Sequence, residues 1–173
     1  MEFFEVLRSR HSARKFGNKE VEDEKLLKIL EAANSAPSAG DLQAYEIVVV
    51  KDAERKKKLV SAAFEQEFIA KAPVVLIFLT NADRSSKRYG KRGAELYCIQ
   101  DATIATAYAQ LAATALGLAS VWVGAFDEKE VAQIINARQN TKPVSMLLVG
   151  YADEQPQLTP RRKLEELIHN ERF

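Results

Sequence analysis

The chain has 173 residues, of which 47% are hydrophobic, enough to build the core of one domain over residues 1–173. Lys and Arg number 25 against 24 for Asp and Glu, and this balance argues against nucleic acid or an anionic membrane as a partner. The single cysteine, Cys98, excludes an internal disulfide and a multi-cysteine metal or iron–sulfur site, and it fits a cytoplasmic protein.

Two helices are predicted before the first strand. Apolar residues recur at helical spacing between Phe3 and Leu7. A second run of this kind covers residues 26–33 and ends before Pro37, a residue that cannot continue a helix. The segment that contains Arg10 is therefore expected between two helices.

Four strands are predicted further along the chain. Residues 46–51 and 74–80 are short, β-branched and apolar, which is typical of buried strands. Two more strands are expected at residues 119–123 and 145–151. Because the strands alternate with helices without a regular strand–helix–strand cadence, the pattern favours a three-layer α+β sandwich over a doubly wound sheet.

Residues 94–116 are predicted to form one long helix, about 35 Å in length at about 1.5 Å per residue. Its only charged side chains are Glu95 and Asp101, so we expect the helix to be buried nearly all round. A small chain alone cannot easily cover a helix on every side, whereas a second subunit could. The helix falls short of the about 20 apolar residues that a membrane span needs.

Several common catalytic motifs are missing from the sequence. It has no glycine fingerprint for dinucleotides, no phosphate-binding loop and no histidine-rich metal motif. The two histidines, His11 and His169, stand in no recognisable triad or zinc-ligand spacing. Hydrolysis by a catalytic triad or by zinc is therefore not expected.

A basic, hydroxyl-rich segment, residues 8–15 (RSRHSARK), follows the first predicted helix. Guanidinium groups bind phosphate through forked hydrogen bonds, so the segment could bind an anionic group. A solvated basic loop has the same composition and is the commoner explanation for such a cluster. The lysines at 56–58 are expected to form a solvated helix face.

Three other segments could contribute to a ligand site. Residues 36–43 (APSAGDLQ) leave backbone N–H groups and side-chain amides available to a planar polar ligand, or they form an ordinary turn. Residues 121–126 (VWVGAF) end a strand at a glycine that a ligand could approach. Residues 159–163 (TPRRK), after an extended connection at 153–160, could complete a phosphate site or begin a short terminal helix.

Together and in this order, the four segments resemble the FMN-dependent nitroreductase family over almost the whole chain. RSRHSARKF is similar to the family's Arg-(His/Arg)-Ser-x-(Arg/Lys) motif, and APSAGDLQAY to its Ala-Pro-Ser-(Ser/Ala)-Gly-Asn-x-Gln-Pro-(Trp/Phe) motif. GLASVWVGAF resembles its Gly-Leu-Gly-Ser-x-Trp-x-Gly segment, and GYADEQPQLTPRRKLEELI resembles its closing stretch. The resemblance implies a three-layer α/β/α sandwich with a central mixed, mainly antiparallel sheet, assembled as an intertwined homodimer.

The resemblance also implies a flavin site shared between two subunits. Arg10 and Arg161 would meet the phosphate of flavin mononucleotide (FMN), His11 and Ser12 would line the ribityl chain and ring, and Arg14 would lie by the pyrimidine edge. The other subunit would contribute five residues, Pro37, Ser38, Ala39, Asp41 and Gln43. The backbone at Gly124 would lie near the redox-active edge.

Three features depart from the family pattern or leave a choice open. Asp41 replaces the usual asparagine, which exchanges an amide for an acceptor-only carboxylate and puts its flavin contact in question. Arg162 could replace Arg161 at the phosphate. The short segment 82–93 is expected to be a remnant of the family's lid, so an open pocket follows as a hypothesis.

The function implied is ping-pong hydride transfer from NADH or NADPH to FMN and then to nitroaromatics, quinones or related acceptors. FMN would carry the chemistry, with no catalytic side chain and no metal. One alternative uses the same fold, a specialised flavoenzyme of the dehalogenase or dehydrogenase type; another, from a different class, is a non-catalytic flavin-binding protein. A nucleic-acid-binding protein is disfavoured by the net charge of +1.

Overall fold

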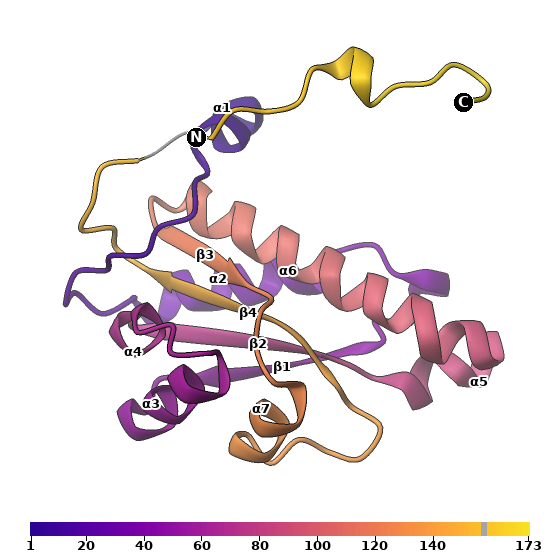
Figure 1. Cartoon of the computed structure of the whole chain (residues 1–173), viewed down its shortest axis with the longest axis horizontal. Coiled ribbons are helices and arrows are strands. Elements are labelled where there is room, and N and C mark those ends of the chain that lie inside the picture. The colour runs from indigo at the N-terminus through magenta and orange to yellow at the C-terminus, as the bar shows by residue number, and fades with distance from the viewer. Residues whose placement is uncertain (157–158) are drawn as a thin grey trace.

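The computed structural model describes residues 1–156 and 159–173, and its central feature is a four-stranded sheet between two layers of helices (Figure 1). The strands are β1 (Tyr45–Val50), β2 (Val74–Thr80), β3 (Ala119–Val123) and β4 (Pro143–Gly150). They lie in the order β1-β2-β4-β3, and each neighbouring pair is antiparallel. A parallel bridge between Ser12 and Ser120 adds to the edge at β3. The predicted α+β sandwich is confirmed.

The described residues form seven α-helices. They are α1 (Phe3–Ser9), α2 (Asp23–Asn34), α3 (Ala53–Ala62), α4 (Phe68–Lys71), α5 (Ala82–Arg92), α6 (Cys98–Ala115) and α7 (Glu128–Ile134). A π-helix (Gly93–Tyr97) leads into α6, and short 3-10 helices lie at Ala39–Asp41 and Leu164–Glu166. The helices α4, α5 and α7 were not predicted, and α4, with four residues, is too short to display a helical period.

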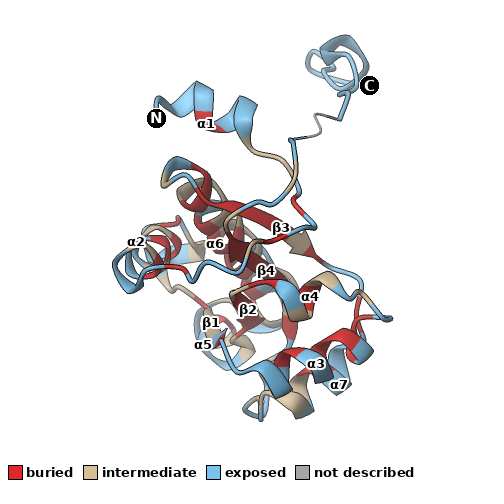
Figure 2. Cartoon of the chain, turned by 90° about the vertical axis from the view of Figure 1, so that its left-hand side faces the viewer, coloured by how far each residue is buried: buried red, intermediate tan, exposed pale blue. Residues whose placement is uncertain are grey.

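The strand β2 shows why helices cover both faces of the sheet. All seven of its residues are buried, as predicted. Val75 and every second residue after it join a core cluster with α3, α4 and α7, whereas Val74 and every second residue after it join a cluster with α2 and α6. Figure 2 shows the buried residues gathered in these central strands. The prediction that β1 is buried is wrong, because β1 is an edge strand and most of its residues are half-buried.

The predicted long helix is confirmed in extent, as the π-helix and α6 together run from Gly93 to Ala115. The prediction that it is buried nearly all round is wrong for the single chain. The side of the helix that faces the sheet is buried, whereas Ile99 and Tyr108 on the other side are 37% and 40% exposed. No element of the described chain covers that side completely. Among the described helices, none is long and apolar enough to cross a membrane.

A carboxylate at the start of α2 ties this helix to the end of the sheet. Both oxygens of Glu22 accept from the Tyr151 hydroxyl, at 2.9 and 2.8 Å, and Lys19 pairs with Glu22 at 3.0 Å. Hydrogen bonds from the Glu22 backbone, from Tyr151 and from Lys19 lower the pKa of the Glu22 carboxyl to about 2. The ionised carboxylate therefore stabilises the folded chain.

We expect Glu22→Gln to lower the melting temperature at neutral pH. The ordinary pKa of Glu22 is 4.5 and the folded pKa is about 2, so its stabilising contribution is complete above pH 4.5 and is lost as the pH falls toward 2. The melting temperatures of the parent and of Glu22→Gln, measured at several pH values between 7 and 2, should therefore become equal near pH 2. A difference that stays constant over this range would contradict the assignment. Glu31→Gln, which removes a carboxylate of α2 that bonds to neither Lys19 nor Tyr151, is the control.

Candidate functional site

The segment that follows α1 is extended and pairs with the edge of the sheet. Arg10 ends α1 with an extended backbone, and its N–H donates to the Val6 carbonyl at 3.0 Å. Farther on, the Ala13 N–H donates to the Ser120 carbonyl at 3.0 Å, and the Ala13 side chain is fully buried. Because neighbouring side chains of an extended segment point to opposite faces, Arg14 points away from the core.

A pocket of about 370 Å³ lies along this segment. Its walls come from the segment after α1 and from the segment after β4: Arg10, His11, Ser12, Arg14, Glu154, Gln155 and Thr159. In the described part of the chain, neither Arg10 nor Arg14 forms an ion pair. Two guanidinium groups that form no ion pair, four positions apart in the sequence and in one pocket, can bind an anionic ligand.

His11 brings an unpaired nitrogen to the pocket wall. Its Nδ1 lies 3.1 Å from the Ser9 carbonyl, and because a carbonyl only accepts, Nδ1 must carry the proton in this bond. In the neutral ring with this tautomer Nε2 is an acceptor, and it is buried without a hydrogen-bond partner in the described structure. His11 also lines a neighbouring pocket of about 220 Å³ together with Ser120, whose hydroxyl is likewise unpaired. Such groups fit a ligand or an ordered water that can donate hydrogen bonds.

Arg14 has two neighbours outside the set of predicted site residues. Its backbone N–H donates to Glu154 Oε1 at 2.6 Å, and its guanidinium lies 5.9 Å from the centre of the Phe68 ring. Glu154 stands within the closing motif, so a closer inspection of that motif could have found it. Phe68 stands in a segment without any recognised pattern.

Gln66, another residue without a sequence signal, connects this area with the end of β3. Its amide Nε2 donates to the carbonyls of Ala63 and Ala125, both at 2.9 Å. Ala125 follows Gly124, which is exposed, and Phe68 near Gln66 contacts Arg14. The turn before α4 therefore brings Gly124 and Arg14, two predicted site residues, to the same side of the molecule.

The terminal arginines differ in their contacts. The Arg161 guanidinium donates to the hydroxyl of Thr159 at 3.4 Å, and Thr159 lines the arginine pocket. Arg162 instead binds Glu166, through a carboxylate oxygen at 3.5 Å and the backbone carbonyl at 2.8 Å. The arrangement favours Arg161 for an anion in the pocket.

Part of the connection predicted at 153–160 lies outside the described residues, which omit 157 and 158. The predicted terminal helix is reduced to one 3-10 turn.

The second predicted segment, residues 37–43, forms a tight loop with a strained backbone. Gly40, Asp41 and Gln43 have φ angles of 59°, 56° and 45°, a region in which non-glycine residues are rare. The Gln43 N–H donates to the Ser38 hydroxyl oxygen at 2.9 Å, and the Gln43 side chain donates to Asp41 Oδ1 at 3.3 Å. These bonds hold the loop in one compact conformation.

The helix α5 packs on this loop. Arg84 Nε donates to the Leu42 carbonyl, and Arg88 Nη1 donates to the Gly40 carbonyl at 3.3 Å. A Cβ at Gly40 would meet the Tyr89 hydroxyl and come within 2.9 Å of Arg88 Nη1, both at the ends of flexible side chains, so it is the φ angle of 59° that favours glycine here. Residues 82–93, expected as a lid remnant, thus include a helix that supports the loop.

The predicted site residues form two separate half-sites in one chain. The loop at 37–43 borders a pocket of about 530 Å³, lined by Pro37, Ser38, Ala39, Tyr97, Ile99, Gln100, Asp101, Thr103 and Ile104. None of these residues lines the arginine pocket. Figure 1 shows α1 and α5, which flank the two half-sites, at opposite ends of the molecule.

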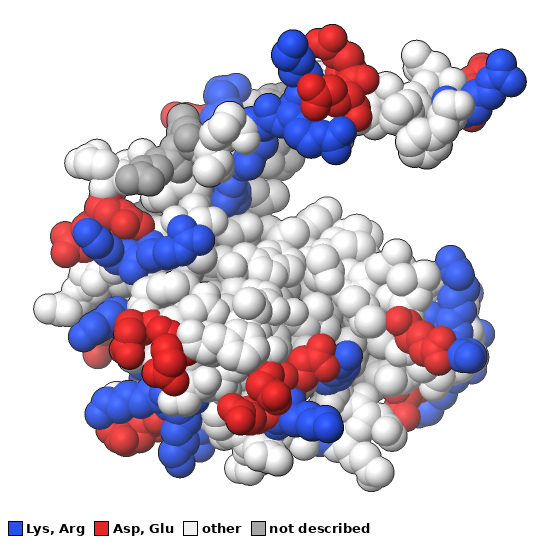
Figure 3. Space-filling view, in the orientation of Figure 1, with Lys and Arg blue, Asp and Glu red and all other residues white. Residues whose placement is uncertain are grey.

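An uncharged surface lies between the two half-sites. The exposed side of α6 includes Ile99 and Tyr108, and the one charged residue of the helix, Asp101, is buried. Figure 3 shows Lys, Arg, Asp and Glu around the margin of this face, with few charges in its middle. An uncharged face of this kind is typical of a surface that another protein surface covers.

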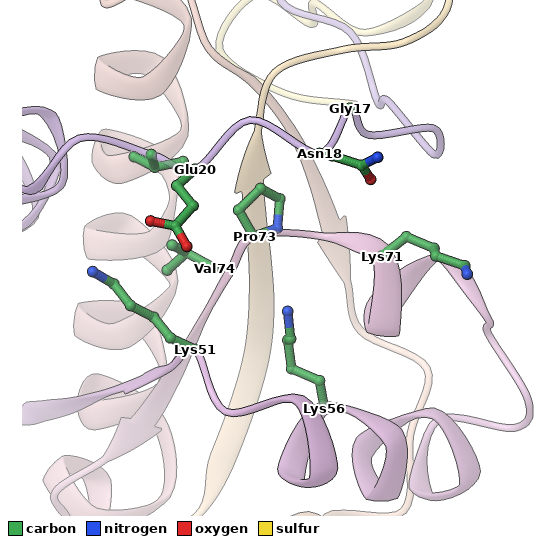
Figure 4. A pocket seen from close by; sticks show the side chains of 9 residues that line it. Gly17, Asn18, Glu20, Lys51, Lys56, Lys71, Pro73 and Val74 are labelled. Carbon is green, nitrogen blue, oxygen red and sulfur yellow. The ribbon is translucent and has the colours of Figure 1, made fainter.

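A further pocket of about 280 Å³ lies at the start of β2 and contains lysines (Figure 4). The prediction of a solvated face at 56–58 is wrong for Lys56, which is 8% exposed because it packs beneath α4 and donates to the Ala72 carbonyl at 2.7 Å. Burial lowers the pKa of Lys56. In Figure 4, Lys51 and Lys71 point in opposite directions, and Lys51 pairs with Asp23 at 2.8 Å. The lysines do not converge on one ligand, so we assign Lys56 a structural role at the end of α4.

Comparisons with known proteins agree with this geometry. A family model described as the nitroreductase family matches residues 7–67 and 60–151. A protein of Bacillus subtilis named FMN reductase (NAD(P)H) is 31% identical over 185 residues, which cover 99% of this chain and 74% of the relative.

Solved structures show the same arrangement of helices and strands. The structure of NfrA2 from B. megaterium superposes with a TM-score of 0.92 at 29% identity, over 100% of this chain and 76% of that chain. The structure of an NADPH:FMN oxidoreductase from Vibrio harveyi, in complex with NAD+, superposes with a TM-score of 0.90 at 25% identity, over 99% of this chain and 77% of that chain.

Proposed function

The chain belongs to the nitroreductase family, and from this we propose that it is an FMN-dependent oxidoreductase that takes electrons from NADH or NADPH and passes them to nitroaromatics, quinones or related acceptors. The observation that carries the proposal is the pocket in which the guanidinium groups of Arg10 and Arg14 have no ion-pair partner among the described residues, beside the unpaired nitrogen of His11. We place the protein in the cytoplasm, a prediction that rests on its single cysteine.

The residues that line the arginine pocket, together with Arg161 beside it, fit the parts of FMN. Arg10 and Arg161 are the cations for the phosphate, and the free acceptor of His11 suits a ribityl hydroxyl, which can donate. Ser12 offers a hydroxyl to the same chain. Arg14, which lies over Phe68, is the cation for the polar edge of the ring. When bound, FMN supplies the redox chemistry by accepting two electrons from the nicotinamide donor and releasing them to the acceptor.

The role of the chain is to bind and orient these molecules. The proposal assigns no side chain as nucleophile or general base, because the electron transfer takes place between the flavin and its partners. The contacts of Gln66 with Ala125 hold the turn at Gly124, where the exposed backbone is open to a bound ring. The short α5 leaves room for acceptors of different shapes.

We propose that the active form is an intertwined homodimer with two shared flavin sites. The two half-sites of one chain are separate, and the uncharged face of α6 between them suits a second copy. In this arrangement the loop at 37–43 of one subunit would face the arginine pocket of the other. The apolar side chains of Phe4, Leu164 and Phe173, which are 64%, 69% and 104% exposed, would be covered by the second copy.

The decisive test is the colour and reduction of the purified protein. We expect a yellow protein whose flavin absorbance bleaches when NADH or NADPH is added without oxygen and returns when a quinone is added. A colourless protein that cannot be reconstituted with FMN would refute the proposal. A yellow protein that neither nicotinamide reduces would instead be a flavin-binding protein or an enzyme with another electron donor.

Arg14→Ala should lower the midpoint potential of the bound flavin. A cation at the pyrimidine edge stabilises the negative charge of the reduced flavin, and removing about 1.4 kcal/mol of this interaction shifts a two-electron potential by about 30 mV. The measurement is a potentiometric titration with a reference dye. Lys15→Ala removes the neighbouring cation, which does not line the pocket, and should leave the potential unchanged. Equal potentials for Arg14→Ala and the parent would exclude this role.

A further inference from the structure

Asp101 is a buried carboxylate that joins α6 to the loop at 37–43. Its side chain is on the first turn of α6, and the residue is 1% exposed. Oδ1 accepts from the Ala39 N–H at 2.9 Å, and Oδ2 accepts from the Ala44 N–H at 3.2 Å. One carboxylate therefore holds two backbone positions, one near each end of the loop.

The chemistry of these bonds requires a carboxylate. In the described part of the chain Asp101 forms no ion pair, and a buried charge without a cation is costly unless hydrogen bonds stabilise it. Both groups that face Asp101 are N–H donors, and an ionised carboxylate offers two acceptors and no donor. An asparagine of the same shape could accept from one N–H only, and its own NH₂ would face the other.

The loop also needs an external support. Gly40, Asp41 and Gln43 have positive φ angles, and such backbone strain persists only where the surroundings enforce it. Arg84 and Arg88 contact the outer side of the loop through its carbonyls. Asp101 accepts hydrogen bonds from N–H groups of the loop backbone, and it lines the same pocket as Ser38. The backbone donors and acceptors of the loop are thus bound from two different helices.

We propose that Asp101 is a positioning residue for the flavin site, because it holds the Ala39 and Ala44 N–H groups and so fixes the conformation in which the loop at 37–43 contacts the flavin. The inference rests on the proposed function for the identity of the ligand. Asp101 itself does not need to touch the flavin.

The variant that tests the proposal is Asp101→Asn in the full-length protein. We expect the dissociation constant for FMN, measured by flavin fluorescence, to rise about tenfold, which corresponds to the loss of one buried hydrogen bond. Amide hydrogen exchange at Ala39 and Ala44 should become about tenfold faster, since the bonds that protect these groups are weakened. The exchange experiment can be carried out without FMN.

Thr106→Val is the matched control on the same helix. The Thr106 hydroxyl is fully buried and lies 2.9 Å from the Ser145 hydroxyl, on the side of α6 that faces the sheet. The variant loses a buried hydrogen bond at similar depth without touching the loop. We expect it to lower the melting temperature while the FMN dissociation constant and the exchange at Ala39 and Ala44 stay at the parental values.

The outcomes separate this inference from the proposed function. A parent protein that binds no FMN would overturn both. A parent that binds FMN, with Asp101→Asn binding it equally tightly, would overturn the positioning role alone. An equal loss of FMN affinity in Asp101→Asn and Thr106→Val would also overturn it, because the effect would then come from general destabilisation.

Discussion

Replacing Arg10 by alanine should raise the dissociation constant for FMN by about 100-fold. Hydrogen bonds between charged groups contribute about 1.5–3 kcal/mol each, a forked guanidinium–phosphate contact has two of them, and each 1.4 kcal/mol is a factor of about ten. Arg10 lines the pocket and has no ion-pair partner in the described structure, so its charge is available to the ligand. The affinity can be measured by titrating the apoprotein with FMN and following flavin fluorescence.

Riboflavin, which lacks the phosphate, makes this experiment specific. Arg10→Ala should weaken FMN binding strongly and riboflavin binding little, so the preference of the protein for FMN over riboflavin should largely disappear. Arg8→Ala is the control, because Arg8 is an exposed cation in the last turn of α1 that does not line the pocket. If Arg10→Ala weakened the binding of both flavins to the same degree, Arg10 would support the pocket wall and would not bind the phosphate.

The elements with a strong local pattern could be predicted from the sequence. A run such as β2 is apolar at every position except Thr80, and this pattern results from burial on both faces, which the structure confirms. The long helix was also placed correctly, since Glu95 and Asp101 are the only charged residues from Gly93 to Ala115. In both cases the information lies within the segment itself.

Errors arose where burial depends on which neighbours are present. The composition of β1 is that of a buried strand, but its place at the edge of the sheet is decided by the order of strands that are far apart in the sequence. Lys56 belongs to a run of three lysines, and only its packing beneath α4 distinguishes it from Lys57 and Lys58, which are exposed. Local sequence carries no signal for either fact.

In the candidate site, too, the residues with a local motif could be predicted, whereas those defined by distant neighbours could not. The motifs led to Arg10, His11, Ser12 and Arg14, which the structure brings together in one pocket. Partners from distant segments were not predicted. Glu154, which accepts a hydrogen bond from the Arg14 N–H, is 140 residues away from it in the sequence, and Asp101 is 62 residues from Ala39. In the sequence, Asp101 stands out only as one of two charged residues in a helix predicted to be buried. Its role depends on which backbone N–H groups face it, and this is a property of the folded chain.

Phe78→Ala should lower the free energy of unfolding by about 3–5 kcal/mol, and the melting temperature by roughly 10 °C for a chain of this size. Phe78 is fully buried in the centre of β2, in the cluster that includes Ile29 of α2 and Ala105 of α6. The small alanines of α6 cannot fill the space that the ring would leave, so a cavity would remain. Thermal melts at equal protein concentration measure the effect, since the stability of an oligomer depends on concentration.

The same variant separates the stability of the fold from the geometry of the site. Phe64→Ala is its control, because Phe64 is 67% exposed and its loss should change the unfolding free energy by no more than about 0.5 kcal/mol. Ala39 and Ala44, the residues that Asp101 holds, do not belong to the core cluster of Phe78, so Phe78→Ala should bind FMN nearly as tightly as the parent at temperatures where it is folded. Asp101→Asn should show the opposite pattern, with a small change in melting temperature and a large change in affinity. If both variants lost stability and affinity in the same proportion, the loop and the core would behave as one cooperative unit, and Asp101 would have no separate positioning role.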